Sequence, residues 1–292
     1  MRFDRNARRR WVNWIVSGVA LACVVVALIP LGSILYTAAS IGGRVLSITF
    51  LTGPETVPCS FQLDPNCSYG GVWPAISGSL VLVGLSSLIA IPVGILAGIY
   101  LSEYARKDRL SLGRPVSFFS DVMTGFPSIV VGVFVYSLFY LLAPGIVFSA
   151  LTGSVALAII MIPVVTRTTE EALRLVPNSL REAAHALGIP HYRATLNIVL
   201  STGRSALITG AILAVMRSAG ETAPLLITAF GNPHGFQGFT KPTEALGPLI
   251  FYYGTSPWPN QIGSAWGMSL VLIFMMLIIS IGARLALRRR FG

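Results

Sequence analysis

Charged residues are scarce in this sequence. Only 11% of its 292 residues are Asp, Glu, Lys or Arg, against about 25% in an average soluble protein. Hydrophobic residues make up 54% of the chain. Cysteine is scarce as well, and a chain of this length with three cysteines is not a disulfide-rich secreted scaffold. The composition also excludes a disordered chain and an ordinary soluble enzyme, and it indicates an all-α, polytopic membrane protein.

Lysine is almost absent. Neither Lys107 nor Lys241 follows a glycine, so the chain lacks the Gly-Lys-Ser/Thr core of a Walker loop and cannot hydrolyse ATP by that mechanism. It also contains neither His-Glu-x-x-His nor Gly-x-Ser-x-Gly. The three histidines, His185, His191 and His234, are divided between two loops. We therefore predict that the chain is not an enzyme and holds no metal or cofactor.

Acidic residues are fewer than basic ones, and the formal net charge is +10. In a soluble protein this excess would suggest a nucleic-acid partner. Here the basic residues cluster between long apolar runs and do not alternate with aromatic residues, as a nucleic-acid surface would require. The charge therefore points to the surface of a lipid bilayer and excludes nucleic acid.

Long apolar runs recur six times. A membrane-spanning helix needs about 20 mostly apolar residues, and such runs occupy residues 12–38, 75–101, 117–142, 147–166, 205–230 and 263–287. The first run has a basic start and could be a cleaved secretory signal, which would leave five spans. Its apolar stretch, from Ile15 to Tyr36, is longer than the roughly 7–15 residues of such a signal. We therefore predict a retained anchor and six transmembrane helices.

The basic residues also predict the orientation of these helices. Eighteen of them lie on the side of the N-terminus, in residues 1–11, in residues 106–114, in a loop at 167–204, and at the end of the chain up to residues 288–292. Only Arg44 and Lys241 lie in the opposite loops, residues 39–74 and 231–262. By the positive-inside rule, both termini are expected to be cytoplasmic.

Two of the three cysteines share the first outer loop. Cys59 and Cys67 lie in residues 39–74, on the side of the membrane where a disulfide would persist. A disulfide and two free thiols are both compatible with the sequence.

The loop at 167–204 contains a short amphipathic helix. Ser179 and Glu182 match a capping box at its start, and Gly188 matches a stop at its end. Its apolar face is predicted to consist of Leu180, Ala183, Ala184 and Leu187. A helix of about two turns is marginal alone in water, so this one must pack either into a partner's groove or onto its own bundle.

This loop resembles a known element. Glu182-Ala183-Ala184-x-x-x-Gly188, followed by Ile198 and Leu200, is similar to the EAA loop of ABC importer permeases, although Ser201 stands where that family usually has proline. The resemblance implies that Ser179 to Gly188 couple the chain to an ATPase subunit, which would carry the ATP and Mg.

A second candidate site lies inside the fifth run. Arg217 is about thirteen residues into it, near the membrane midplane, and Glu221 follows at i+4 on the same helical face. A charge at this depth costs roughly 2.5–3.5 kcal/mol and by default marks a transport pathway, although a structural salt bridge is the alternative. A guanidinium binds phosphate or carboxylate with two donors, so the pathway is predicted to carry an anion. The hydroxyl of Thr222 and the backbone carbonyl freed by Pro224 would line it.

The surrounding residues extend the resemblance. Arg217-x-x-Gly-Glu-Thr-Ala-Pro224 looks like the signature of permeases of the phosphate-specific ABC importer. So do Tyr100-Leu101-Ser102-Glu103-Tyr104, Gly125-Phe126-Pro127-Ser128-Ile129-Val130 and the run from Arg167 to Ala172. Residues 248–253 fit the A-type subunit. The resemblance implies a type I ABC importer permease fold over residues 75–287, in the cytoplasmic (inner) membrane of a prokaryote. It also implies a paralogous permease subunit, ATPase subunits and an extracytoplasmic phosphate-binding protein as partners.

The same resemblance assigns roles within the pathway. Arg217 would contact phosphate, Glu221 would be its charged neighbour or gate, and Pro127 and Ser128 would line or bend the path. Other oxyanions such as sulfate or molybdate remain alternatives, as does a membrane scaffold without transport. Gly94-x-x-x-Gly98 favours close helix packing rather than chemistry. The aromatic residues of the loop at 231–262 are compatible with an outer gate, an interfacial belt or a docking surface.

Overall fold

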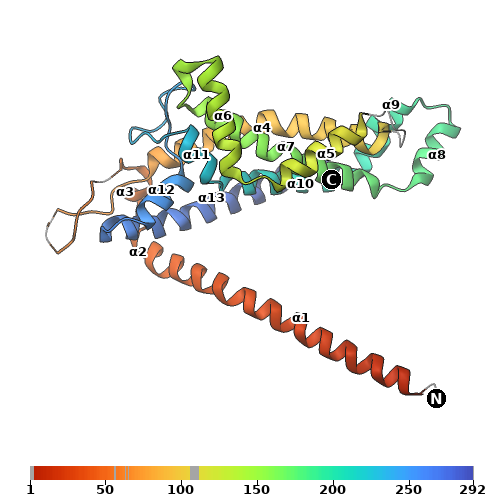
Figure 1. Cartoon of the computed structure of the whole chain (residues 1–292), viewed down its shortest axis with the longest axis horizontal. Helices are drawn as coiled ribbons and strands as arrows, with labels where there is room; N and C mark the ends of the chain where they lie inside the picture. The colour runs from red at the N-terminus through yellow and green to blue at the C-terminus, as the bar shows by residue number, and fades with distance from the viewer. Residues whose placement is uncertain (1–2, 56, 63, 65, 106–111, 292) are drawn as a thin grey trace.

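The part of the chain that the structure describes is mostly helical. This computed structural model describes residues 3–55, 57–62, 64, 66–105 and 112–291. Among them no strand forms, and the one β-bridge pairs Phe230 with Thr243. The predicted all-α fold is confirmed (Figure 1).

The helices follow the apolar runs closely. The α-helices are α1 (Phe3–Thr37), α2 (Gly43–Val45), α3 (Ile48–Thr52), α4 (Trp73–Ile99), α5 (Gly113–Gly125), α6 (Ser128–Leu142), α7 (Ala150–Arg174), α8 (Asn178–Ala186), α9 (His191–Ala194), α10 (Leu200–Ala219), α11 (Ala223–Thr228), α12 (Leu246–Gly254) and α13 (Pro259–Phe291). Three π-helical segments, η1 (Ala38–Gly42), η2 (Tyr100–Tyr104) and η4 (Thr195–Val199), and the 3-10 turn η3 (Pro144–Ile146) connect them.

Two of the predicted spans are not continuous helices. Five segments are long and apolar enough to cross a membrane, and the pair α5 and α6 makes a sixth only if it counts as one span bent by 111°. The expected helix at 117–142 breaks at Phe126, because the residue before a proline is disfavoured in helical geometry. The expected helix at 205–230 ends at Ala219 and resumes at Ala223. In both places the structure divides the predicted apolar run between two helices.

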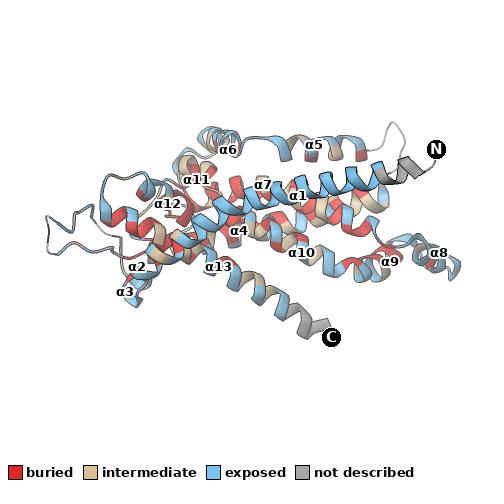
Figure 2. Cartoon of the chain, turned by 90° about the horizontal axis from the view of Figure 1, so that it is seen from below, coloured by how far each residue is buried: buried red, intermediate tan, exposed pale blue. Residues whose placement is uncertain are grey.

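The centre of the bundle is the contact between α4 and α7. Gly94 and Gly98 of α4 face α7, and a Cβ atom at Gly98 would lie 2.5 Å from the Cβ of Thr169. At Gly94 it would lie 2.6 Å from the Cβ of Val165. The small residues therefore allow the two backbones to approach closely, as the spacing of the glycines predicted. Around this pair pack α10 and the bent pair α5 and α6 (Figures 1 and 2).

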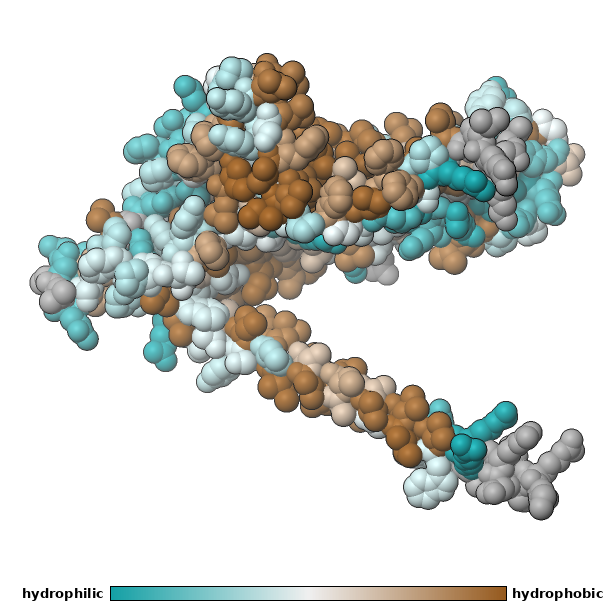
Figure 3. All heavy atoms as spheres, viewed as in Figure 1, coloured by the Kyte–Doolittle hydropathy of each residue, from teal (hydrophilic) through white to brown (hydrophobic). Residues whose placement is uncertain are grey.

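Helix α1 stands apart from this bundle. It meets the rest of the chain through η1, and none of its most apolar 18-residue window is buried (Figure 2). Its surface is apolar along most of its length, as is the middle of the visible bundle surface, whereas polar residues gather towards the ends (Figure 3). This distribution matches a helix that is surrounded by lipid or by another protein.

The two ends of the bundle differ in character. The start of α1 lies on the same side as α8 and α9, and the loop between α3 and α4 lies on the opposite side (Figure 1). We call these sides the α8 end and the disulfide end, because Cys59 and Cys67 form a disulfide in that loop. Of the basic residues used to predict the orientation, Arg2, Arg106, Lys107 and Arg109 lie outside the described residues, and the side chains of Arg5 and Arg288 to Arg290 are not described.

The disulfide loop is tied to α13 by buried polar residues. The Asn260 carboxamide is fully buried, accepts a hydrogen bond from the Cys59 amide and donates to the carbonyl oxygens of Val57 and Ser68. The Ser264 hydroxyl donates to the Tyr69 carbonyl oxygen at 2.6 Å. Such bonds satisfy loop carbonyls that would otherwise be buried without partners, so they fix the loop over the start of α13.

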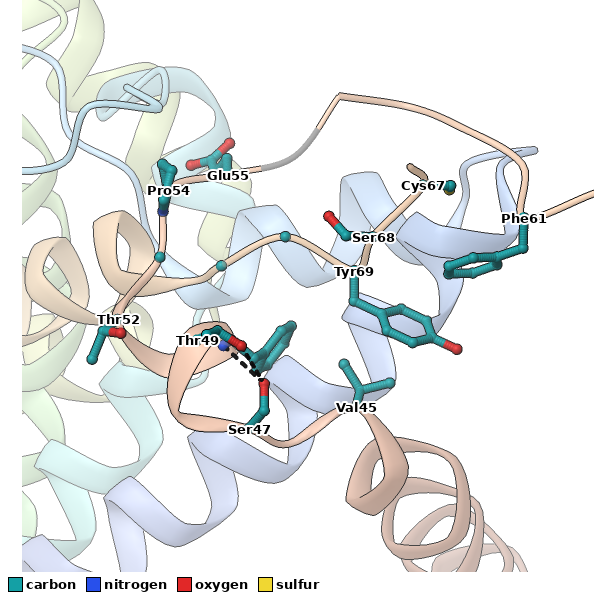
Figure 4. A pocket seen from close by; sticks show the side chains of 14 residues that line it. Val45, Ser47, Thr49, Thr52, Pro54, Glu55, Phe61, Cys67, Ser68 and Tyr69 are labelled. Carbon is teal, nitrogen blue, oxygen red and sulfur yellow. Dashed lines mark hydrogen bonds between the residues drawn. The ribbon is translucent and has the colours of Figure 1, made fainter. Parts of the chain in front are cut away.

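A carboxyl group of this loop lines a pocket of about 710 Å³ (Figure 4). Burial, reinforced by the negative charge of Glu244, raises the pKa of Glu55 to about 7, against the opposing effect of a hydrogen bond with Tyr253. Burial also raises the pKa of Glu244. Tyr253 is itself buried in the apolar core at this end, whereas Phe251 and Tyr252 are exposed. The aromatic residues of the loop at 231–262 are thus divided between core and surface.

The first prediction concerns the glycines of α4. Gly98→Ala places a Cβ 2.7 Å from the Thr166 carbonyl oxygen, and such overpacking costs roughly 1–3 kcal/mol. We expect a lower melting temperature for the detergent-solubilised variant. Gly84→Ala is the matched control, because a Cβ at Gly84 meets nothing within 4 Å. Equal melting temperatures for the two variants would contradict the close packing of α4 on α7.

The second prediction concerns Glu55. Folding raises the pKa of Glu55, so the folded state resists ionisation of this carboxyl more than the unfolded state does. The free energy of unfolding should therefore fall as the pH rises from about 4.5 to about 7, and then level off. Glu55→Gln cannot ionise, and its melting temperature should fall less between pH 5 and pH 8. Some dependence of the melting temperature on pH should remain, because the pKa of Glu244 is also raised. Asp64→Asn, which alters an exposed carboxyl of the same loop, should keep the parental slope, and an identical slope in both variants would refute the prediction.

Candidate functional site

The predicted charge pair lies at a helix break. Helix α10 ends at Ala219, and the amide groups of Gly220 and Glu221 donate to the carbonyl oxygens of Arg217 and Ser218 in a tight turn. The Nε of Arg217 lies 3.8 Å from Oε1 of Glu221. The two residues therefore meet as predicted, but across a turn and not along a continuous helix. The Arg217 side chain is 55% exposed and that of Glu221 is 16% exposed.

The break between α5 and α6 lies next to the break between α10 and α11. A Cβ atom at Gly132 of α6 would lie 2.8 Å from the Cα of Pro224 in α11, and α6 packs along α11. Ser128, the first residue of α6, precedes Gly132 by one helical turn and is half-buried, whereas Pro127 is exposed. The amino end of α6 is thus brought beside the segment that follows Arg217. In membrane transporters, the positive amino ends of discontinuous helices face anionic substrates.

The two other predicted pathway residues have packing roles in this structure. Pro224 is buried against Gly132, and its carbonyl oxygen accepts a hydrogen bond from the Thr228 hydroxyl at 2.8 Å. Thr222 is half-buried and precedes α11. A Cβ at Gly247 of α12 would lie 3.0 Å from the Thr222 hydroxyl. Gly247 was not among the predicted site residues, and its one signal in the sequence is that it precedes a proline.

A groove of about 540 Å³ lies between α7 and α10. Its lining is mainly apolar and includes the polar residues Thr168, Glu171, Thr202 and Thr209 as well as Leu213. Leu213 precedes Arg217 by one helical turn on the same face of α10. Arg217 itself does not line the groove, and it lies one turn of α10 beyond the residue at which the groove ends.

The short helix of the loop at 167–204 is present but begins differently from the prediction. Helix α8 starts at Asn178 with Pro177 as its N-cap, and no side chain caps it. Ser179 lies inside the helix, so the predicted capping box with Glu182 is wrong: the proline already ends the preceding segment. Gly188 does stop the helix, with φ of +73°, and the Ile189 amide donates to the Ala184 carbonyl oxygen.

The apolar face of α8 is divided. Ala184 is 2% exposed and is the residue that α8 buries, and the helix packs chiefly against α9 and η4. Leu180 and Leu187 are 40% and 80% exposed, and Ala183 and Glu182 are exposed too. The predicted apolar face is therefore divided: Ala184 is buried within the chain, and the other apolar residues are exposed and accessible to a partner.

Helix α8 is attached to the bundle by Arg181, a residue that was not among the predicted site residues. Arg181 forms an ion pair with Glu103 of η2, at 2.7 Å between Nη2 and Oε1. Glu103 belongs to a recognised motif without an assigned role, and Arg181 was counted only as a basic residue of the loop. The single signal for the pair is a carboxylate at the very end of an apolar run, where a charge needs a partner.

The chain matches a family model over residues 90–290, that of the "binding-protein-dependent transport system inner membrane component". It is 38% identical to the phosphate transport system permease protein PstA of Yersinia pestis, covering 99% of this chain and 94% of the relative. It is 37% identical to the PstA of Haemophilus influenzae, covering 98% of each chain. For PstA 1 of Mycobacterium tuberculosis (strain CDC 1551 / Oshkosh), the identity is 35%, with 97% of this chain and 92% of the relative covered.

Solved structures share the fold. An inward-facing structure of the MetNI methionine ABC transporter aligns with a TM-score of 0.59 at 18% identity, covering 75% of this chain and 96% of that one. A bacterial ABC transporter that imports alginate aligns with a TM-score of 0.56 at 14% identity, covering 97% of this chain and 99% of that one.

The family model covers most of the chain, and the relatives match it almost end to end. The chain therefore belongs to the binding-protein-dependent transport system inner membrane components, and within them to the family of phosphate transport system permease proteins, which are multi-pass membrane permeases of ABC importers.

Proposed function

We propose that this chain is a permease subunit of an ABC importer that carries inorganic phosphate across the cytoplasmic membrane of a prokaryote by alternating access. The observation that carries the proposal is the position of Arg217, a partly exposed arginine at the break between α10 and α11. The names of the curated relatives, phosphate transport system permease proteins, support phosphate as the substrate.

The geometry of the charge pair suits a transient anion site. A guanidinium presents a planar fork of donors that matches phosphate, and it keeps its charge when water is removed. At 3.8 Å, the contact between Arg217 and Glu221 is longer than a hydrogen bond. Glu221 therefore orients Arg217 in the empty pathway, yet phosphate can displace it without breaking a strong bond.

The exposed surfaces of the chain suit the other subunits of such an importer. The open side of Arg217 would face a paralogous permease subunit, so that the pathway runs between the two. Leu180, Ala183 and Leu187 of α8 are exposed and would dock into an ATPase subunit that binds ATP and Mg. An extracytoplasmic phosphate-binding protein would meet the disulfide end, with α8 and both termini on the cytoplasmic side.

The third prediction tests the role of Arg217. In proteoliposomes that contain the whole importer, Arg217→Ala should lower phosphate uptake by at least about 30-fold. The variant loses the contact between the guanidinium and phosphate, and truncating one partner of a desolvated charge contact costs roughly 2–5 kcal/mol. The ATPase should still co-purify, since Arg217 lies in the last turn of α10, whereas α8 packs against α9 and η4, which precede the first turn of that helix. Arg284→Gln, which removes an exposed arginine of α13, is the control and should retain parental uptake.

Competing anions distinguish the alternatives in the same experiment. Parental uptake by Arg217→Ala would refute the pathway assignment. If sulfate or molybdate competed with phosphate at equal concentration, the substrate would be a broader class of oxyanion. If the parental complex imported no anion, the chain would have to be a scaffold.

The fourth prediction tests the docking surface on α8. Leu187→Glu introduces a charge at a side chain that is 80% exposed, so the variant should fold normally but lose most of the ATPase on co-purification. Leu175→Glu is the matched control, because Leu175 is 82% exposed but is the C-cap of α7, whereas Leu187 is the C-cap of α8. Equal recovery of the ATPase with both variants would show that the subunit docks elsewhere.

A further inference from the structure

Arg181 of α8 uses all of its N–H donors in hydrogen bonds within the chain, and most of them reach residues outside α8. Nε and Nη2 of Arg181 donate to Oε2 and Oε1 of Glu103, at 3.2 and 2.7 Å. The remaining donors reach the carbonyl oxygen of Val176 at 2.6 Å, that of Leu173 at 2.9 Å, and Oδ1 of Asn178 at 3.2 Å. A guanidinium has five N–H groups, so none is left for a ligand.

These contacts join α8 to the two central helices of the bundle. Glu103 lies in η2, the direct continuation of α4, and its side chain is only 3% exposed. Leu173 lies in the last turn of α7, and Val176 follows that helix. Arg181 itself is 19% exposed. Charge-assisted hydrogen bonds in such a buried setting are stronger and more specific in direction than neutral ones, so the attachment is rigid.

Helix α8 has a second, apolar attachment on its other side. It packs against α9 and η4, and these segments lead directly into α10, whose last turn carries Arg217. The chain thus links α8 to α10 through packing and to α4 and α7 through Arg181. Without Arg181, a displacement of α8 would be passed on mainly to α10.

We propose that Arg181 and Glu103 are positioning residues that transmit the movement of α8 to α4 and α7, so that ATP hydrolysis and phosphate movement stay coupled. This inference rests on the proposed function, in which α8 receives the movement from an ATPase. Arginine is required, because the ammonium of a lysine cannot donate in a fixed fork to a carboxylate and to two carbonyl oxygens at once.

The fifth prediction concerns the number of phosphate ions imported per ATP hydrolysed. It is measured on the complete importer in proteoliposomes, with the binding protein present. Arg181→Gln and Glu103→Gln should each lower this ratio by about tenfold, the effect of losing one charge-assisted attachment, while ATP hydrolysis continues. Arg181→Lys should not restore the ratio. The double variant should be no worse than Arg181→Gln, because both changes remove the same contact.

The control is Arg174→Gln. Arg174 is 66% exposed and pairs with Glu170 at the same end of the bundle, so its loss removes the same charge without touching α8, and the ratio should stay parental. If uptake and hydrolysis fell together in the Arg181 and Glu103 variants at an unchanged ratio, the pair would serve only stability and the inference would be overturned. Should Arg181→Gln fail to assemble, Glu103→Gln decides alone, because Arg181 keeps its bonds to the carbonyl oxygens of Leu173 and Val176. Failure of the parental complex to import phosphate overturns the proposed function instead.

Discussion

A backbone inside a bilayer must satisfy its own hydrogen bonds, and this requirement governs where the helices of this protein can break. Irregular backbone at membrane depth persists only where protein covers it or where it lines a polar space. The two breaks, at Phe126 to Pro127 and at Gly220 to Thr222, meet the requirement locally: the amide groups of Gly220, Glu221 and Val130 all find carbonyl partners within their own turns. The site around Arg217 depends on this solution, because a continuous helix would have left no exposed backbone end for an anion to meet.

Glycine is what brings the two breaks together. At Gly132 there is no room for a Cβ beside Pro224, and at Gly247 there is little beside Thr222. These contacts hold α6 and α12 against the start of α11, in the same way as Gly94 and Gly98 hold α4 against α7. Lipid supplies no hydrophobic drive for helix association, so close van der Waals contact and interhelical hydrogen bonds must supply it. The position of the amino end of α6 is therefore a consequence of packing between small residues, not of charge.

Hydropathy predicted that the chain is built from apolar helical segments, since bilayer thickness sets the length of such segments. It could not predict the breaks, because a sum over a window does not register a change of direction at one or two residues. The spacing of Arg217 and Glu221 predicted their proximity correctly, since i and i+4 remain neighbours across the turn. It did not predict the attachment of α8: Arg181 and Glu103 are 78 residues apart, and two of the other acceptors are backbone carbonyl oxygens, which no side-chain pattern encodes. The apolar face of α8 was predicted, but the division between buried Ala184 and exposed Leu187 depends on tertiary packing.

Two of the charge pairs in this chain, Arg181–Glu103 and Arg217–Glu221, differ in how tightly they are held. Arg181 and Glu103 approach to 2.7 Å, are largely buried and are fixed by further hydrogen bonds, so removing one partner would leave the other buried without compensation. Arg217 and Glu221 are 3.8 Å apart, with the arginine more than half exposed, and such a pair contributes little to stability. Under the proposed function, the rigid pair lies where force from the ATPase would enter, and the loose pair lies where phosphate would pass. A strong bond at Arg217 would compete with the substrate, and a weak one at Arg181 would let α8 move without the bundle.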